Sequence, residues 1–151
     1  MTDGVASGPD MLPEMDDTPT RPRGALRLAA AWLPALGWAG LIFALSAQPG
    51  LRVAPDEAVD LVVRKVGHMA VFGILALLAW RALERTTTLR RPWAWALGLT
   101  IVYALTDELH QAFVAGRQAS LVDVAIDAVG ALLAVGGLAL ARSRGSRVRG
   151  A

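Results

Sequence analysis

The residues best suited to chemistry are carboxylates and an imidazole near the end of one apolar segment. Asp107, His110 and Gln111 stand at positions i, i+3 and i+4, so they share one face of a helix, with Glu108 about 100° round the helix from Asp107. A carboxylate one turn from an imidazole can orient the ring and raise its basicity, as general-base catalysis requires. The same spacing fits a polar contact that locks two helices together.

A second acidic group opens a later apolar segment. Ser120 and Asp123 have the Ser-x-x-Asp spacing of a helix N-terminal cap, which would account for Asp123 without any chemical role. Asp127 lies one turn deeper on the same face, where capping does not explain it, and Gly130 follows as an expected point of close helix approach. Asp127 is therefore the more informative carboxylate of the two.

Basic side chains come from two other stretches. Arg117 follows Gly116 in a predicted turn, where a guanidinium can clamp a phosphate or carboxylate in a bidentate manner. Pairing with Asp107, Glu108 or Asp123 is the alternative for this arginine. Lys65 can be explained as a lysine whose long side chain extends to the membrane interface. His68 lies one turn inside an apolar segment, and its presence there has no comparable explanation.

The remaining polar candidates end the first apolar segment. Ser46 and Gln48 fit either a shared site or a simple helix stop before the Pro49-Gly50 turn. The candidate catalytic residues are His68, Asp107, Glu108, His110 and Asp127. The candidate substrate-binding residues are Ser46, Gln48, Lys65, Gln111, Arg117 and Asp123. We expect no metal and no cofactor, because the histidines and carboxylates lack any strong ligand spacing.

The composition places these residues in a membrane protein. Of the 151 residues, 54% are hydrophobic and only 19% are charged, and the mean hydropathy is +0.44, whereas soluble domains have about 45–50% apolar and about 25% charged residues. The absence of cysteine excludes disulfides, thiolate catalysis and iron–sulfur clusters. The net charge of +2 gives little support to nucleic-acid binding, and we expect no such partner.

Four apolar segments are long enough to cross a bilayer, and they predict an all-α bundle of four transmembrane helices. They cover residues 28–45, 66–83, 92–113 and 121–141. Residues 56–64, with charges on one face, predict a short interfacial helix before the second span. Residues 1–24 predict a disordered tail, residues 25–142 the membrane domain, and residues 143–151 a basic tail.

The basic residues predict the orientation of this bundle. Eleven arginines fall in the two tails and the middle loop, and four basic residues fall on the other side. The first group is Arg21, Arg23, Arg27, Arg81, Arg85, Arg90, Arg91, Arg142, Arg144, Arg147 and Arg149, and the second is Arg52, Arg64, Lys65 and Arg117. By the positive-inside rule both termini are cytoplasmic, so the candidate residues converge on the extracytoplasmic face.

Taken in order, these motifs resemble the VanZ-like family. The resemblance rests on Ser46-Ala-Gln48-Pro49, on Lys65-x-x-His68, and on the string from Asp107-Glu108-x-His110-Gln111 through Gly116-Arg117 to Asp123 and Asp127. It implies a multi-pass protein of the bacterial cell membrane, from a family whose namesake is linked to tolerance of the glycopeptide teicoplanin. Distant kinship with enzymes that exchange or cleave lipid head groups is an analogy.

Three hypotheses follow for the function. The first is an enzyme that hydrolyses or transfers a phosphate-containing head group of a lipid or lipid-linked cell-wall precursor, with a histidine as base or nucleophile. The second is a non-catalytic protein that binds a lipid head group or a lipophilic glycopeptide. A proton or solute pathway ranks last, because the cytoplasmic halves of the spans lack ionisable groups. The small residues of the fourth span leave the oligomeric state open.

Overall fold

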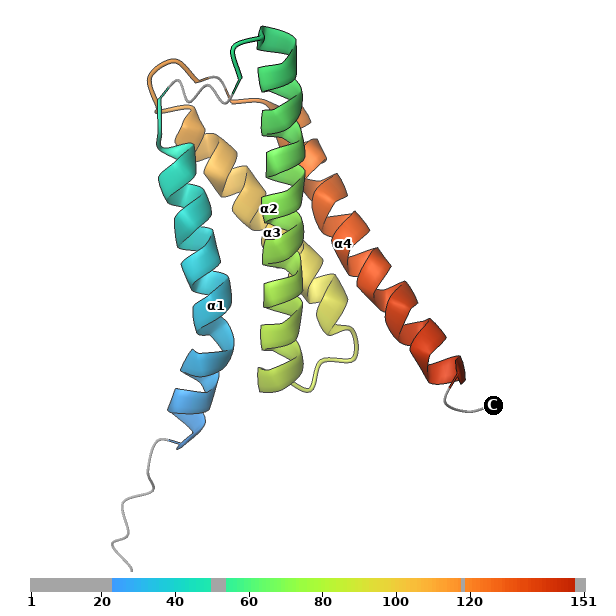
Figure 1. Cartoon of the computed structure of the whole chain (residues 1–151). Helices are drawn as coiled ribbons and strands as arrows, with labels where there is room; N and C mark the ends of the chain where they lie inside the picture. Colours follow the sequence, from blue (N-terminus) through green and yellow to red (C-terminus); the bar gives the residue numbers. More distant parts are fainter. Residues whose placement is uncertain (1–22, 50–53, 118, 149–151) are drawn as a thin grey trace, which may run out of the picture.

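Four long helices account for nearly all of the structure. The computed structural model describes residues 23–49, 54–117 and 119–148, which contain helices and no strand. The helices are α1 (Arg23–Ser46), α2 (Glu57–Thr86), α3 (Pro92–Gln111) and α4 (Leu121–Val148) (Figure 1). The predicted all-α fold is confirmed. The expected tail at residues 1–24 falls almost wholly outside the described residues, and residues 143–148 continue α4.

The region before the second apolar segment differs from the expected arrangement. The Asp56 side chain accepts a hydrogen bond from the Val59 N–H at 2.9 Å and caps α2, which then continues without a break to Thr86. No glycine or proline lies between Glu57 and Val66 to interrupt the helix. Residues 57–64 therefore form the first turns of α2, and the separate interfacial helix is not confirmed.

Three of the helices are apolar and long enough to cross a membrane. They are Gly24–Ser46, Glu57–Thr86 and Leu121–Gly145. The 20-residue α3 has a comparable length, but its last two turns carry Asp107, Glu108, His110 and Gln111 and lower its hydropathy. These findings establish a membrane protein. A fourth crossing by α3 remains the expectation from the sequence.

The central position in the bundle belongs to α2. It packs against α1, α3 and α4, whereas α1 and α4 make no contact with each other within the described residues. The C-terminal ends of α1 and α3 meet the N-terminal ends of α2 and α4 at one end of the bundle (Figure 1). The short connection from α2 to α3 lies at the opposite end.

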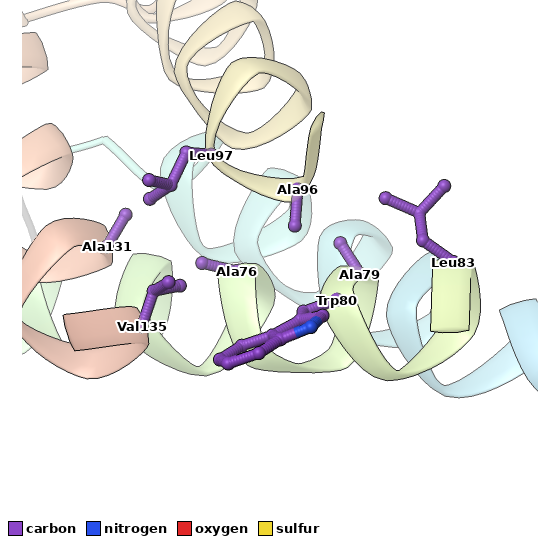
Figure 2. Packing of buried hydrophobic residues seen from close by; sticks show 8 residues of the cluster. All are labelled: Ala76, Ala79, Trp80, Leu83, Ala96, Leu97, Ala131 and Val135. Atoms are coloured by element: carbon purple, nitrogen blue, oxygen red, sulfur yellow. The ribbon is translucent and has the colours of Figure 1, made fainter. Parts of the chain in front are cut away.

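Small side chains in the core allow the helices to pack close together. In the cluster shared by α2, α3 and α4, each of the three helices contributes alanines or an alanine, which pack with larger apolar side chains (Figure 2). The full cluster is Ala76, Ala79, Trp80, Leu83, Ala96, Leu97, Ala131 and Val135. The alanines let helix backbones approach closely. Helices associate in lipid through such close packing, because no hydrophobic driving force acts between them there.

The closest approach is between α2 and α4 at two glycines. A Cβ atom built on Gly130 would overlap the Met69 backbone and lie 2.6 Å from its Cα. A Cβ on Gly73 would lie 3.1 Å from the Gly130 carbonyl oxygen. The expected role of Gly130 as a point of close helix approach is thus confirmed.

At the opposite end of the bundle, polar contacts join the same two helices. Arg142 of α4 donates to Glu84 of α2 at 2.7 Å, and its guanidinium lies 4.5 Å from the centre of the Trp80 ring. An arginine over an indole face gains a cation–π interaction in addition to the ion pair. The two helices are therefore joined by side chains beyond their glycine contact.

We predict that Gly130→Ala destabilises the protein by about 1–3 kcal/mol. The new methyl group would overlap the Met69 backbone, which cannot avoid it by changing rotamer as a side chain could. Gly136→Ala is the matched control, since nothing lies within 4 Å of a Cβ at that position. The measurement is the melting temperature of the detergent-purified protein. Equal melting temperatures for Gly130→Ala and Gly136→Ala would refute the close contact.

Candidate functional site

The candidate residues lie where α1 and α3 end and α2 and α4 begin (Figure 1). Ser46 is the last residue of α1, and Asp107 to Gln111 form the last turns of α3. His68 lies about three turns into α2, and Asp127 about two turns into α4. Residues far apart in the sequence are therefore brought to one end of the bundle.

His68 of α2 faces Asp127 of α4. The His68 Nδ1 lies 3.4 Å from the Asp127 Oδ1, a long separation for a hydrogen bond, and the side chains are 29% and 3% exposed. Both atoms are buried and have no other hydrogen-bond partner in the described structure. Asp127 is therefore the carboxylate that faces the imidazole, and His68 also lines both of the cavities described below.

Asp107 joins α1 to α3. Its Oδ2 accepts a hydrogen bond from the Ser46 Oγ at 2.7 Å and another from the Gln111 Nε2 at 3.0 Å. All three side chains are buried. The buried Oδ1 of Asp107 has no hydrogen-bond partner among the described residues. Asp107 therefore acts first as a polar tie between helices, one of the two roles considered for it.

His110 contacts α1 through its ring. Its ring stacks on Phe43 of α1 with centroids 4.2 Å apart and an interplanar angle of 25°. The described contacts include no hydrogen bond between His110 and Asp107, and His110 is not among the residues that line the two cavities described below. Of the two histidines, His68 lines the cavities and His110 does not.

Glu108 caps the start of α4. Its Oε1 accepts the Ser120 N–H at 2.6 Å, which is the N–H that Asp123 would accept in a capping box. Asp123 instead accepts from the Lys65 Nζ at 2.6 Å, in a pair that is about one-third exposed. The cap expected from Asp123 is thus supplied by Glu108 of α3, and Lys65 is an ion-pair partner.

Arg117 is the cation with the least compensation at the site. Its Nη1 donates to the Ser46 carbonyl oxygen at 3.2 Å, and it forms no ion pair with any carboxylate in the described part of the chain. The preceding Gly116 adopts a φ of 79°, which directs the turn after α3. The alternative in which Arg117 pairs with a nearby acid is not observed.

Two adjoining cavities are lined by some of these side chains but not by Asp107, Glu108 or Asp127. The polar cavity, of about 610 Å³, is lined by Glu57, Leu61, Arg64, Lys65, His68, Gln111, Gly116, Arg117, Asp123 and Ile126. A smaller one of about 270 Å³ is lined mainly by apolar residues of α1 and α2. Gln48 is exposed and lines neither. A ligand in the polar cavity would meet both His68 and Arg117.

Arg64 was not among the expected site residues, although it lines both cavities. Its Nε lies 3.0 Å from the Asp60 Oδ2 one turn earlier. The sequence held a usable signal, because Arg64 and His68 are four residues apart and share a face of α2. The described residues include no group of three or more potential ligands able to hold a metal ion.

Comparison with known proteins gives one positive result. A protein-family model described as VanZ/LLP1 matches residues 27–142, a range that includes every candidate site residue. No curated protein and no solved structure matches the chain significantly.

We predict that Glu108→Ala lowers the unfolding free energy by about 0.5–2 kcal/mol, because the N–H of Ser120, the residue just before α4, loses its acceptor. Glu108→Gln keeps an oxygen at the same position and should retain most of the stability. The check is the melting temperature of both variants in detergent. A Glu108→Ala protein as stable as wild type would contradict the capping role.

Proposed function

The chain belongs to the VanZ/LLP1 family, and we propose that it acts on a phosphate-containing head group of a lipid or lipid-linked cell-wall precursor. One observation carries this proposal: His68, oriented by Asp127, and Arg117, which has no ionic partner among the described residues, line the same cavity. A guanidinium of this kind is suited to a phosphate. An imidazole beside it is suited to moving a proton during attack on that phosphate.

The chemistry assigned to each residue follows from these contacts. The His68 Nε2, on the side of the ring away from the nitrogen that faces Asp127, takes a proton from a water molecule while the water oxygen attacks phosphorus. The bond from phosphorus to the leaving oxygen breaks, and the imidazolium returns the proton to that oxygen. Asp127 stabilises the charged imidazolium, and Arg117 stabilises the charge on the phosphoryl oxygens. An alcohol in place of water gives head-group transfer by the same steps.

The other carboxylates take part indirectly in this proposal. Asp107 holds Ser46, whose carbonyl oxygen receives the hydrogen bond from Arg117. Glu108 positions the start of α4 and hence the helix that carries Asp127. Their contacts support positioning roles. If the substrate is a cell-wall precursor, the same activity provides a route to glycopeptide tolerance.

We predict that His68→Gln lowers head-group turnover by about 100-fold or more, the usual size of a general-base contribution. His110→Phe is the matched control, because a phenyl ring can keep the stack on Phe43. The measurement is mass spectrometry of purified protein in vesicles of bacterial lipids and lipid-linked precursor. Melting temperatures of both variants show whether folding survives.

The alternative function is non-catalytic binding of a lipid head group or a lipophilic glycopeptide. It needs Arg117 but no proton transfer by His68. Absence of turnover by stable wild-type protein, with ligand retention lost in Arg117→Gln, would replace the enzyme proposal with this one. Equal turnover in wild type and His68→Gln would contradict the role given to the imidazole.

We further propose four membrane crossings with both termini in the cytoplasm, which puts the cavity at the outer face. The arginine distribution supports this orientation. Because the chain has no cysteine, single cysteines can be introduced without background. We predict that a membrane-impermeant maleimide labels intact cells at Gln48→Cys but not at Thr87→Cys. The reverse pattern would invert the topology.

A further inference from the structure

The smaller cavity lies between α1 and α2 beside the polar one. Its apolar wall is formed by Ile42, Leu45, Val63, Gly67 and Val71. It shares Arg64, His68 and Arg117 with the polar cavity. The smaller cavity, which we call the groove, therefore adjoins the polar cavity at His68 and Arg117, the residues that the proposed reaction uses.

The groove is also accessible from the side of the bundle. Leu45 on α1 and Val63 on α2 are 50% and 47% exposed, and both belong to helices apolar enough to lie in a membrane. Gly67 leaves the groove unfilled, since nothing lies within 4 Å of a Cβ built there. In a membrane such a surface is offered to lipid chains rather than to water.

The charges at the junction favour one kind of occupant. Arg64 is paired with Asp60 and Lys65 with Asp123, whereas Arg117 has no carboxylate partner in the described structure. An anion entering at the junction would therefore be compensated mainly by Arg117. A ligand with a phosphate next to a hydrocarbon chain matches both Arg117 and the apolar groove.

We propose that this groove holds one hydrocarbon chain of an amphiphile whose phosphate lies beside Arg117 and His68, and that the ligand enters sideways from the bilayer between α1 and α2. This inference rests on the proposed function, because it assigns to the same site the place of the substrate's hydrocarbon chain and its route of entry. A water-soluble phosphate ester would occupy the polar cavity alone and leave the groove unused.

Gly67→Leu tests the groove directly, because its side chain would fill space that is empty in the structure. Gly98→Leu is the matched control, since this exposed glycine of α3 also has nothing within 4 Å of its Cβ position. The probe is dodecyl phosphate with a diazirine in its chain, photolysed with the protein in vesicles. Labelled residues are located by mass spectrometry.

We predict that wild type and Gly98→Leu are labelled at residues of the groove, such as Leu45 and Val63. Labelling there should fall by about tenfold in Gly67→Leu, the loss expected if about two methylene groups are no longer buried. Arg117→Gln should reduce labelling by the phosphate probe but not by the corresponding diazirine dodecanol.

The result that overturns the inference is labelling spread over exposed helix faces and unchanged by Gly67→Leu. Labelling by dodecanol that depends on Arg117 as strongly as labelling by dodecyl phosphate would also overturn it. The readout needs no turnover, so its outcome is separate from that of the proposed reaction. Specific labelling without turnover of any lipid would retain the groove and refute the enzyme.

Discussion

The arrangement of the site depends on the backbone contact between α2 and α4 at Gly130. Gly130 lies one turn after Asp127, and the Met69 backbone that it touches follows directly after His68. The separation of the two helices at this level therefore sets the distance from the imidazole to the carboxylate. A side chain at position 130 would move the helices apart and carry Asp127 away from His68. The turn of α2 at His68–Met69 and the turn of α4 at Asp127–Gly130 therefore set both the packing of the two helices and the His68–Asp127 pair.

The buried acids at this end of the bundle do different work despite their proximity. Asp107 binds Ser46 and Gln111, Glu108 binds the N–H that opens α4, and Asp127 faces His68. Burying a carboxylate is costly unless hydrogen bonds or charges compensate it. Each of these acids has a specific partner, so directed polar contacts bring several chain segments together at this end of the bundle.

The sequence predicts the helices well because the length of an apolar segment and the polar or turn-forming residues that bound it are local properties. It predicts their limits less well: residues 56–64 were expected to form a separate interfacial helix, whereas residues 57–64 are the first turns of α2. Helical spacing places Asp107 and His110 on one face, yet the first contacts Ser46 and the second Phe43. The rotation of α3 against α1 decides this, and spacing within one helix carries no information about it. The pair of His68 and Asp127 joins two helices and depends on their crossing, so single-helix patterns could not identify it.

The helices are not tied to one another in the same way. At the two ends of their contact, α2 and α4 are joined by Lys65 with Asp123 and by Glu84 with Arg142. By contrast, α1 is attached through hydrogen bonds, such as those from Trp38 to the Val71 carbonyl oxygen and from Tyr103 to the Ala39 carbonyl oxygen. Pro34 also removes one backbone hydrogen bond within α1. The bundle thus combines α2 and α4, which are cross-linked by ion pairs, with α1, whose described side-chain contacts are hydrogen bonds and a ring stack, so ionic strength acts on the first pair of helices more directly than on α1.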